Sequence, residues 1–158
     1  MTSASVHASC VLVGARAVLI RGPSGSGKSR LALQLIQSGR GRYPPFARLV
    51  GDDRIHLQPA GGRLVARAAE TLGGLLEVCG VGIVQLPYEP AAVVGLVVDL
   101  GIDVERMPAA EDQETVVEGI RLPRLAVAAA DPALPAVVAL LTSSPHGFNR
   151  PGPQSIGR

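Results

Sequence analysis

A loop rich in glycine and serine, set between a strand-like and a helix-like segment, constrains this chain more than any other feature. The segment GPSGSGKS, residues 22–29, fits the pattern G-x-x-x-x-G-K-[ST] and follows the apolar run AVLI at residues 17–20. In the segment RLALQLI, residues 30–36, the apolar residues are spaced as one stripe of a helix. A strand, this loop and a helix in that order predict an α/β domain with an anion site.

The residue types of this loop suit the phosphates of a nucleotide. Glycines allow positive φ angles and bring backbone N–H groups around an anion, and the helix N-terminus adds partial positive charge. Lys28 is expected to reach the β- and γ-phosphates, and the Ser29 hydroxyl is expected to hold Mg²⁺. The alternative interpretation is a plain glycine-rich turn. The nucleotide-binding residues predicted here are Gly22, Pro23, Ser24, Gly25, Ser26, Gly27, Lys28 and Ser29.

Composition narrows the architecture and the partners. The chain has 158 residues, of which 47% are apolar and 3% aromatic, and its formal net charge is +2. One domain with a core of small aliphatic side chains is expected. The low charge and few aromatic residues argue against nucleic acid as a partner, and the apolar runs are too short to span a membrane. Cys10 and Cys79 fit no metal-ligand spacing, and an apolar chain of this size needs no disulfide framework. We therefore expect the protein to be in a reducing cytoplasm.

Short β-rich segments outnumber helical ones, which predicts a mixed α/β sheet with few helices. One helix is expected over residues 28–38, and a second, weakened by two internal glycines, over residues 70–77. Residues 1–142 are expected to form the domain, and residues 143–158, rich in Pro, Gly and Ser, a disordered tail. Strands are expected over residues 11–13, 17–21, 49–51, 54–58, 64–66, 82–85 and 93–99.

Two sets of carboxylates are candidates to complete the phosphate site. Asp52 and Asp53 follow an apolar strand, and adjacent strand residues point to opposite faces, so one can face the γ-phosphate while the other is anchored or solvated. Asp99 lies near the end of the most apolar strand, where an ordinary P-loop protein has its metal-binding carboxylate. For the pair, an Asp–Asp turn that only caps the strand is the alternative.

Four segments, in order, resemble the catalytic domain of HPr kinase/phosphorylase, a bacterial enzyme that phosphorylates a serine of the phosphocarrier protein HPr. The resemblance implies an α/β P-loop kinase domain of the HPr kinase and phosphoenolpyruvate carboxykinase type, with ATP and Mg²⁺ as ligands, an HPr-like acceptor and a homohexamer. It points to short members found in alphaproteobacteria, with a Pro/Gly tail in place of the C-terminal helix. The segments are SVHAS at residues 5–9, GPSGSGKS at 22–29, LVGDDR at 49–54 and LLEVCGVGIV at 75–84.

The resemblance also implies roles for individual side chains. Asp52 matches the general base, which takes the proton from the acceptor serine as the new bond forms. Glu77 matches a Mg²⁺ ligand, His7 a histidine beside the catalytic centre, and Arg106 an arginine that neutralises phosphate charge. Cys79 stands where the family has an arginine, and a thiol cannot replace that cation. Dephosphorylation by inorganic phosphate, which brings together two polyanions, is therefore expected to be weak.

Two other functions remain open at this point. A small-molecule or nucleotide kinase needs an arginine-rich lid that closes over both substrates, and only residues 54–67 supply as many as three arginines. A nucleotide-binding switch without transfer activity would be consistent with the cysteine at position 79. The loop chemistry and the resemblance together favour an ATP-dependent protein serine kinase.

Overall fold

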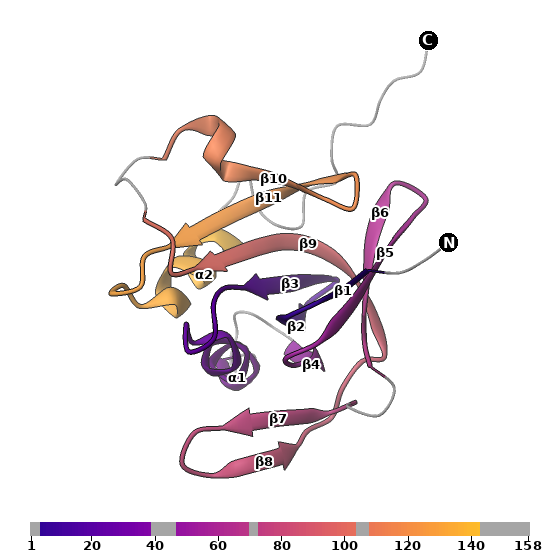
Figure 1. The fold of residues 1–158 in the computed structure, drawn as a ribbon, viewed down its shortest axis with the longest axis vertical. Coiled ribbons are helices and arrows are strands. Elements are labelled where there is room, and N and C mark those ends of the chain that lie inside the picture. The colour runs from indigo at the N-terminus through magenta and orange to yellow at the C-terminus, as the bar shows by residue number, and fades with distance from the viewer. Residues whose placement is uncertain (1–3, 39–46, 70–72, 104–107, 143–158) are drawn as a thin grey trace.

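The computed structural model describes residues 4–38, 47–69, 73–103 and 108–142, and Figure 1 draws the remaining residues in grey. The described residues form one curved main sheet, a separate hairpin and two α-helices (Figure 1). In chain order the elements are β1 (Ala4–Val6), β2 (Ala8–Val13), β3 (Arg16–Arg21), α1 (Lys28–Ser38), β4 (Ala47–Gly51), β5 (Ile55–Ala60), β6 (Arg63–Ala68), β7 (Leu75–Val78), β8 (Gly82–Gln85), β9 (Ala91–Leu100), the 3₁₀-helix η2 (Ala110–Gln113), β10 (Glu114–Val117), β11 (Ile120–Val127) and α2 (Ala133–Thr142).

The nine-stranded main sheet is built around the long strand β9. On one side β9 runs parallel to β3, and on the other it pairs with β6 at its start and with β11 at its end. From β3 the sheet continues through β2 to β4, and from β6 through β5 to β1. β7 and β8 form a two-stranded sheet of their own, which lies beside α1 (Figure 1).

Both faces of the main sheet are buried, which explains why its central strands are continuous apolar runs. Alternate residues of β3 go to opposite faces: Val18 and Ile20 join the core beneath α1 and α2, whereas Leu19 joins the core enclosed by the curl of β5 and β6. Each fully buried Leu or Ile contributes about 1.5–3 kcal/mol relative to exposure. The carboxyl ends of β3 and β9, where the 22–29 loop begins, are therefore firmly held.

Much of the predicted secondary structure is confirmed. All seven expected strands are present, six with the same or wider bounds and that expected over residues 54–58 as β5, which begins one residue later, and α1 spans the predicted residues 28–38. The helix predicted over residues 70–77 is wrong, because Leu75–Val78 is the strand β7. Gly74 has a φ of 79°, and added Cβ atoms at Gly73 and Gly74 would lie 2.7 Å from the Tyr88 ring and 2.6 Å from the Leu86 carbonyl oxygen. These contacts favour an extended entry into the hairpin.

The strands β1, β7, β10 and β11 and the helix α2 were not predicted. α2 carries no charged residue and buries Val137 against the core, so its sequence lacks the polar stripe that marks an amphipathic helix. Pro135 lies in its first turn, where proline is tolerated. The chain thus has a helix before its predicted tail, and residues 143–158 lie outside the described residues.

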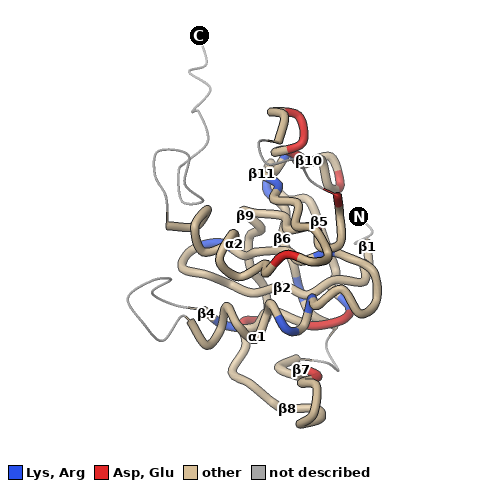
Figure 2. The backbone as a smooth tube through the Cα atoms, turned by 90° about the vertical axis from the view of Figure 1, so that its left-hand side faces the viewer, with Lys and Arg blue, Asp and Glu red and all other residues tan. Residues whose placement is uncertain are grey.

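Charge is spread along the chain rather than gathered by sign. Figure 2 shows blue Lys and Arg segments interspersed with red Asp and Glu segments along the described backbone. Neither helix in the described part of the chain is long and apolar enough to cross a membrane.

Candidate active site

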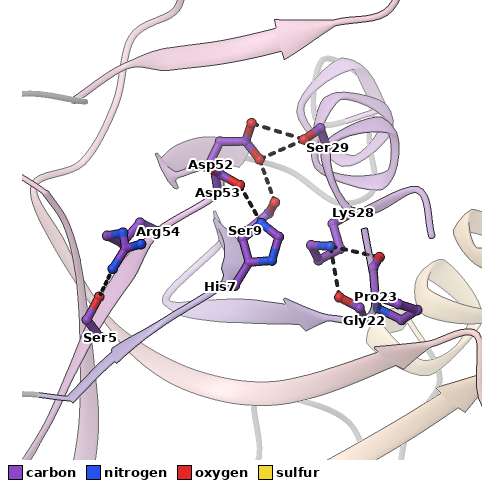
Figure 3. A network of polar contacts seen from close by, with 10 residues as sticks. All are labelled: Ser5, His7, Ser9, Gly22, Pro23, Lys28, Ser29, Asp52, Asp53 and Arg54. Atoms are coloured by element: carbon purple, nitrogen blue, oxygen red, sulfur yellow. Dashed lines mark hydrogen bonds and ion pairs between the residues drawn. The ribbon is translucent and has the colours of Figure 1, made fainter. Parts of the chain in front are cut away.

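The 22–29 loop joins the carboxyl end of β3 to the start of α1 (Figure 3). Gly25 and Gly27 have φ angles of 79° and 99°, which other residues rarely adopt. An added Cβ at Gly22 would lie 2.5 Å from Ser26 Oγ and 3.1 Å from the Leu100 carbonyl oxygen. Three glycines of the motif are therefore required by the shape of the loop itself.

Two side chains of this loop are placed to receive an anion. Lys28 is only 7% exposed, and its Nζ donates to the carbonyl oxygens of Gly22, at 2.9 Å, and Pro23, at 3.0 Å (Figure 3). Neutral carbonyls do not cancel its charge. Among the described side chains, Ser26 Oγ is buried without a hydrogen-bond partner, and such groups normally have one. Lys28 therefore keeps a positive charge in the loop that an oxygen-rich anion would neutralise.

Asp52 connects the loop to β2. Its carboxylate is buried, with the residue 8% exposed. Oδ1 accepts hydrogen bonds from Ser9 Oγ at 2.5 Å and from Ser29 Oγ at 2.9 Å, and Oδ2 accepts from Ser29 Oγ at 3.0 Å (Figure 3). Ser29, the predicted Mg²⁺ ligand, thus contacts the predicted base directly. Both donors are neutral hydroxyls, so the negative charge of Asp52 is available to a cation or a proton.

Asp53 points away from Asp52 because the chain turns sharply between β4 and β5. Asp53 has a φ of 69°, and the Arg54 N–H donates to the Asp52 carbonyl oxygen at 2.8 Å. A bond across a single residue with positive φ is the arrangement of a γ-turn. As expected from the sequence, one carboxylate of the pair is buried and the other is solvated, with Asp53 74% exposed.

Three alternate residues near the N-terminus each contact one residue of this turn. Ser9 bonds Asp52, His7 Nε2 contacts Asp53 Oδ1, and Ser5 Oγ accepts from Arg54 Nη1 at 3.1 Å (Figure 3). Ser5 lies in β1, Ser9 in β2 and His7 between the two strands, and their partners are three consecutive residues, Asp52, Asp53 and Arg54. His7, 52% exposed, lies at the solvent side of this row.

Asp99 has different partners. Arg21 donates from Nε to Oδ1 at 2.7 Å and from Nη2 to Oδ2 at 2.9 Å, and Arg124 Nε donates to Oδ2 at 2.6 Å. Burial alone would raise the pKa of Asp99, but the hydrogen bonds and charges of the two arginines outweigh it and lower the pKa. We call these three residues the Asp99 clamp. Ser29 bonds Asp52, so the carboxylate beside the loop hydroxyl belongs to the Asp pair.

Comparison with known proteins gives the family. A family model described as HPr Serine kinase C-terminal domain matches residues 1–128. The chain belongs to this family. An HPr kinase/phosphorylase of Streptococcus thermophilus is 35% identical over 135 residues, which cover 78% of this chain and 41% of that protein. One of Clostridium tetani is 38% identical over 82 residues, which cover 52% of this chain and 25% of that protein. The chain therefore spans well under half of these relatives.

A solved structure supports the fold. The HPr(Ser) kinase/phosphatase from Coxiella burnetii matches with a TM-score of 0.68 and 25% identity, covering 85% of this chain and 91% of that one. The predicted α/β domain of the HPr kinase type, with a mixed sheet and few helices, is confirmed.

The remaining residues that the HPr kinase resemblance singled out have no hydrogen bond or ion pair to this cluster within the described ranges, or lie outside those ranges. Glu77 is an exposed residue of β7, and within the described ranges no three His, Cys, Asp or Glu residues are grouped to hold a metal. Arg106 lies outside the described residues. Cys79 is exposed and Cys10 is buried, and both are free. Burial raises the pKa of the Cys10 thiol to about 12, which keeps it protonated and unreactive.

Sequence analysis missed three residues that the structure connects to the site of this HPr kinase domain. Ser9 bonds the buried Asp52, and Arg21 and Arg124 hold Asp99. The alternation of Ser5, His7 and Ser9 in SVHAS was a usable signal for Ser9. Arg21, directly before the first loop glycine, was visible in the sequence, but its partner was not.

Proposed function

We propose that this chain is an ATP-dependent protein serine kinase whose acceptor is HPr or a similar small phosphocarrier protein. The observation that carries the proposal is the direct contact of Ser29, the last loop residue, with the buried carboxylate of Asp52. This contact supports the proposal because it joins the 22–29 segment, which is the proposed phosphate site, to an acidic side chain. The names of the relatives, HPr kinase/phosphorylase and HPr(Ser) kinase/phosphatase, support the acceptor.

ATP suits the loop because Lys28 carries a buried positive charge there whose hydrogen-bond acceptors are neutral carbonyls. Ser29 would hold Mg²⁺, with Glu77 as a further ligand on the family resemblance. Protein sites for Mg²⁺ often supply only one or two carboxylates and leave the other positions to phosphates and water. Ser29 with Glu77 is such a partial set. Bound Mg²⁺ would neutralise charge on the phosphates.

Asp52 is the proposed general base. Its Oδ2 accepts from Ser29 alone, whereas Oδ1 accepts from both serines, so Oδ2 is the atom at which the acceptor proton would arrive. The acceptor oxygen forms a bond to the γ-phosphorus, the bond to the bridging oxygen breaks, and ADP leaves. His7 holds Asp53 at the solvent edge, where an acceptor protein would approach, and Arg106 is the proposed cation for phosphate charge.

The test is transfer of labelled γ-phosphate from ATP to a panel of purified phosphocarrier proteins. We expect phosphoserine on one of them, identified by mass spectrometry. Labelling of a small molecule would instead support a metabolite kinase. ATP binding without transfer to any acceptor would support a nucleotide-controlled switch, and either result would contradict the proposal.

Three finer expectations accompany the proposal. Dephosphorylation by inorganic phosphate should be slow because Cys79 replaces the family arginine, and Cys79→Arg should raise its rate while leaving ATP affinity unchanged. The homohexamer implied by the resemblance is testable by light scattering. A reducing cytoplasm is the proposed location, which is consistent with the two free cysteines.

A further inference from the structure

The Asp99 clamp lies directly behind the start of the 22–29 loop. Arg21 is the last residue of β3, and Gly22, the first loop residue, follows it. Arg21 and Asp99 are partners in the parallel pairing of β3 with β9. The two N–H bonds of Arg21 to the two oxygens of Asp99 form a bidentate pair, which fixes the orientation of the guanidinium as well as its position.

The residues after Asp99 support the residues after Arg21. An added Cβ at Gly22 would lie 3.1 Å from both Cβ and the carbonyl oxygen of Leu100, and one at Gly101 would lie 3.6 Å from Pro23 Cδ. The first two loop residues therefore rest on the end of β9. Their carbonyl oxygens are the two acceptors that hold Lys28 Nζ. A continuous series of contacts runs from Asp99 through Arg21 and the loop backbone to Lys28.

We propose that Asp99 is a positioning residue for nucleotide binding, which acts through Arg21 to fix Gly22 and Pro23 and thereby the starting position of Lys28. The inference rests on the proposed function only in that the 22–29 loop binds ATP. Glycine has the largest conformational freedom of any residue, so a loop that begins with one loses order when its anchor is removed. Ordering it again on binding lowers affinity.

A substitution that removes the charge of Asp99 separates a positioning role from a direct electrostatic effect on the nucleotide. Asp99→Asn removes a negative charge beside an anion-binding loop, so electrostatics alone predicts tighter binding of ATP. Loss of positioning predicts weaker binding. Opposite signs are therefore expected from the two explanations for one substitution.

Arg124 provides a matched control on the same carboxylate. Its Nε bonds Asp99 at 2.6 Å and its Nη1 donates to the Asp112 carbonyl oxygen in η2 at 3.2 Å, but it belongs to β11 rather than to β3. Arg124→Gln weakens the clamp from the side away from the loop. A general loss of stability would lower nucleotide affinity in this variant as much as in Arg21 variants.

The experiment measures the Kd of Mg-ATP by titration calorimetry for the full chain and for three variants. We expect Asp99→Asn to raise the Kd about tenfold, roughly 1.4 kcal/mol, and Arg21→Lys, which keeps the charge but loses the fork, to raise it about threefold. Arg124→Gln should change it less than about twofold. If Asp99→Asn does not fold, the Kd values of Arg21→Lys and Arg124→Gln are compared instead, and a greater increase in Arg21→Lys supports the positioning role.

The outcomes separate the inference from the proposed function. Unchanged or tighter binding in Asp99→Asn, or equal losses in Arg21→Lys and Arg124→Gln, would overturn the positioning role while leaving the kinase proposal intact. Absence of ATP binding in the unaltered chain would overturn both. For variants that transfer phosphate, a raised KM for ATP with an unchanged kcat supports positioning, and a fall in kcat alone contradicts it.

Discussion

Asp52 and Asp99 are the two buried carboxylates of the described chain, each 8% exposed, yet their surroundings are opposite. Asp52 follows β4 and accepts from two serine hydroxyls, whereas Asp99, in β9, is held by two arginines. The charge of a carboxylate bonded by neutral donors is not balanced by those donors, so it can attract a metal ion or accept a proton. The charge of a carboxylate paired with two guanidiniums is already balanced by them. Burial of an acidic residue therefore does not indicate a catalytic role unless its partners are known.

The largest effect is expected at Lys28, the residue before Ser29, whose hydroxyl bonds Asp52. Lys28→Ala should weaken Mg-ATP binding by about 10²-fold or more and abolish transfer, because it removes the buried positive charge proposed to bind the phosphates. Calorimetric titration measures the affinity. As a control, urea denaturation should show the same cooperative unfolding in this variant as in the unaltered chain. If the ATP affinity of the variant equals that of the unaltered chain, the 22–29 loop is not a phosphate-binding loop.

The next effect tests whether Asp52 is free to accept a proton. Asp52→Asn keeps the size of the side chain but cannot serve as a base, so transfer should fall by about 10²- to 10⁴-fold with little change in ATP affinity. Asp53→Asn is the matched control at the neighbouring position and should lower the rate less than about tenfold. A normal rate in Asp52→Asn, or the same loss in both variants, would remove Asp52 from the mechanism.

The role of Asp99 should instead appear as an effect on the stability of the fold. Asp99→Asn leaves two arginines without their charged acceptor, and we expect the free energy of unfolding to fall by about 2–3 kcal/mol. Asp52→Asn should lower it less, because serine hydroxyls can also donate to an amide oxygen. Urea unfolding of both variants measures the difference. A greater loss in Asp52→Asn would reverse the comparison.

The smallest effect is a dependence of that stability difference on pH. The pKa of Asp99 is lowered in the folded chain from an ordinary value of 3.8, so the unfolded state binds a proton first as the pH falls. The contribution of Asp99 is complete above that value and is lost as the pH falls through the folded pKa. The difference in unfolding free energy between the unaltered chain and Asp99→Asn should therefore be constant near pH 7 and shrink below about pH 4. A difference that stays constant down to pH 2 would show that the ion pairs do not stabilise the fold.

Features set by neighbouring residues were predictable from the sequence. The 22–29 loop and α1 depend on glycine positions and on a helical stripe within a few residues of one another, and both are confirmed. The helix predicted over residues 70–77 failed for a reason outside the segment. Leu75 and Leu76 are extended because they pair with β8, and the Tyr88 ring packs against the two glycines before them.

Features set by strand pairing were not predictable. Ser9 and Asp52 are 43 residues apart in sequence, and Asp99 and Arg124 are 25 apart. Each contact depends on the register of β2 with β4 or of β9 with β11, and the first of these registers shifts at Cys10. A shift by one residue turns a side chain to the other face, so sequence spacing alone could name Asp52 and Asp99 but not distinguish their partners.

The contrast between the two cysteines makes this chain convenient for fluorescence work. Cys10 is enclosed in the sheet with its pKa near 12, and Cys79 is exposed just after β7. A maleimide dye at neutral pH would therefore attach at one natural position without any engineered substitution. Because β7 packs beside α1, the helix that begins at Lys28, a dye on Cys79 would report in real time any rearrangement of the hairpin when a nucleotide enters the loop.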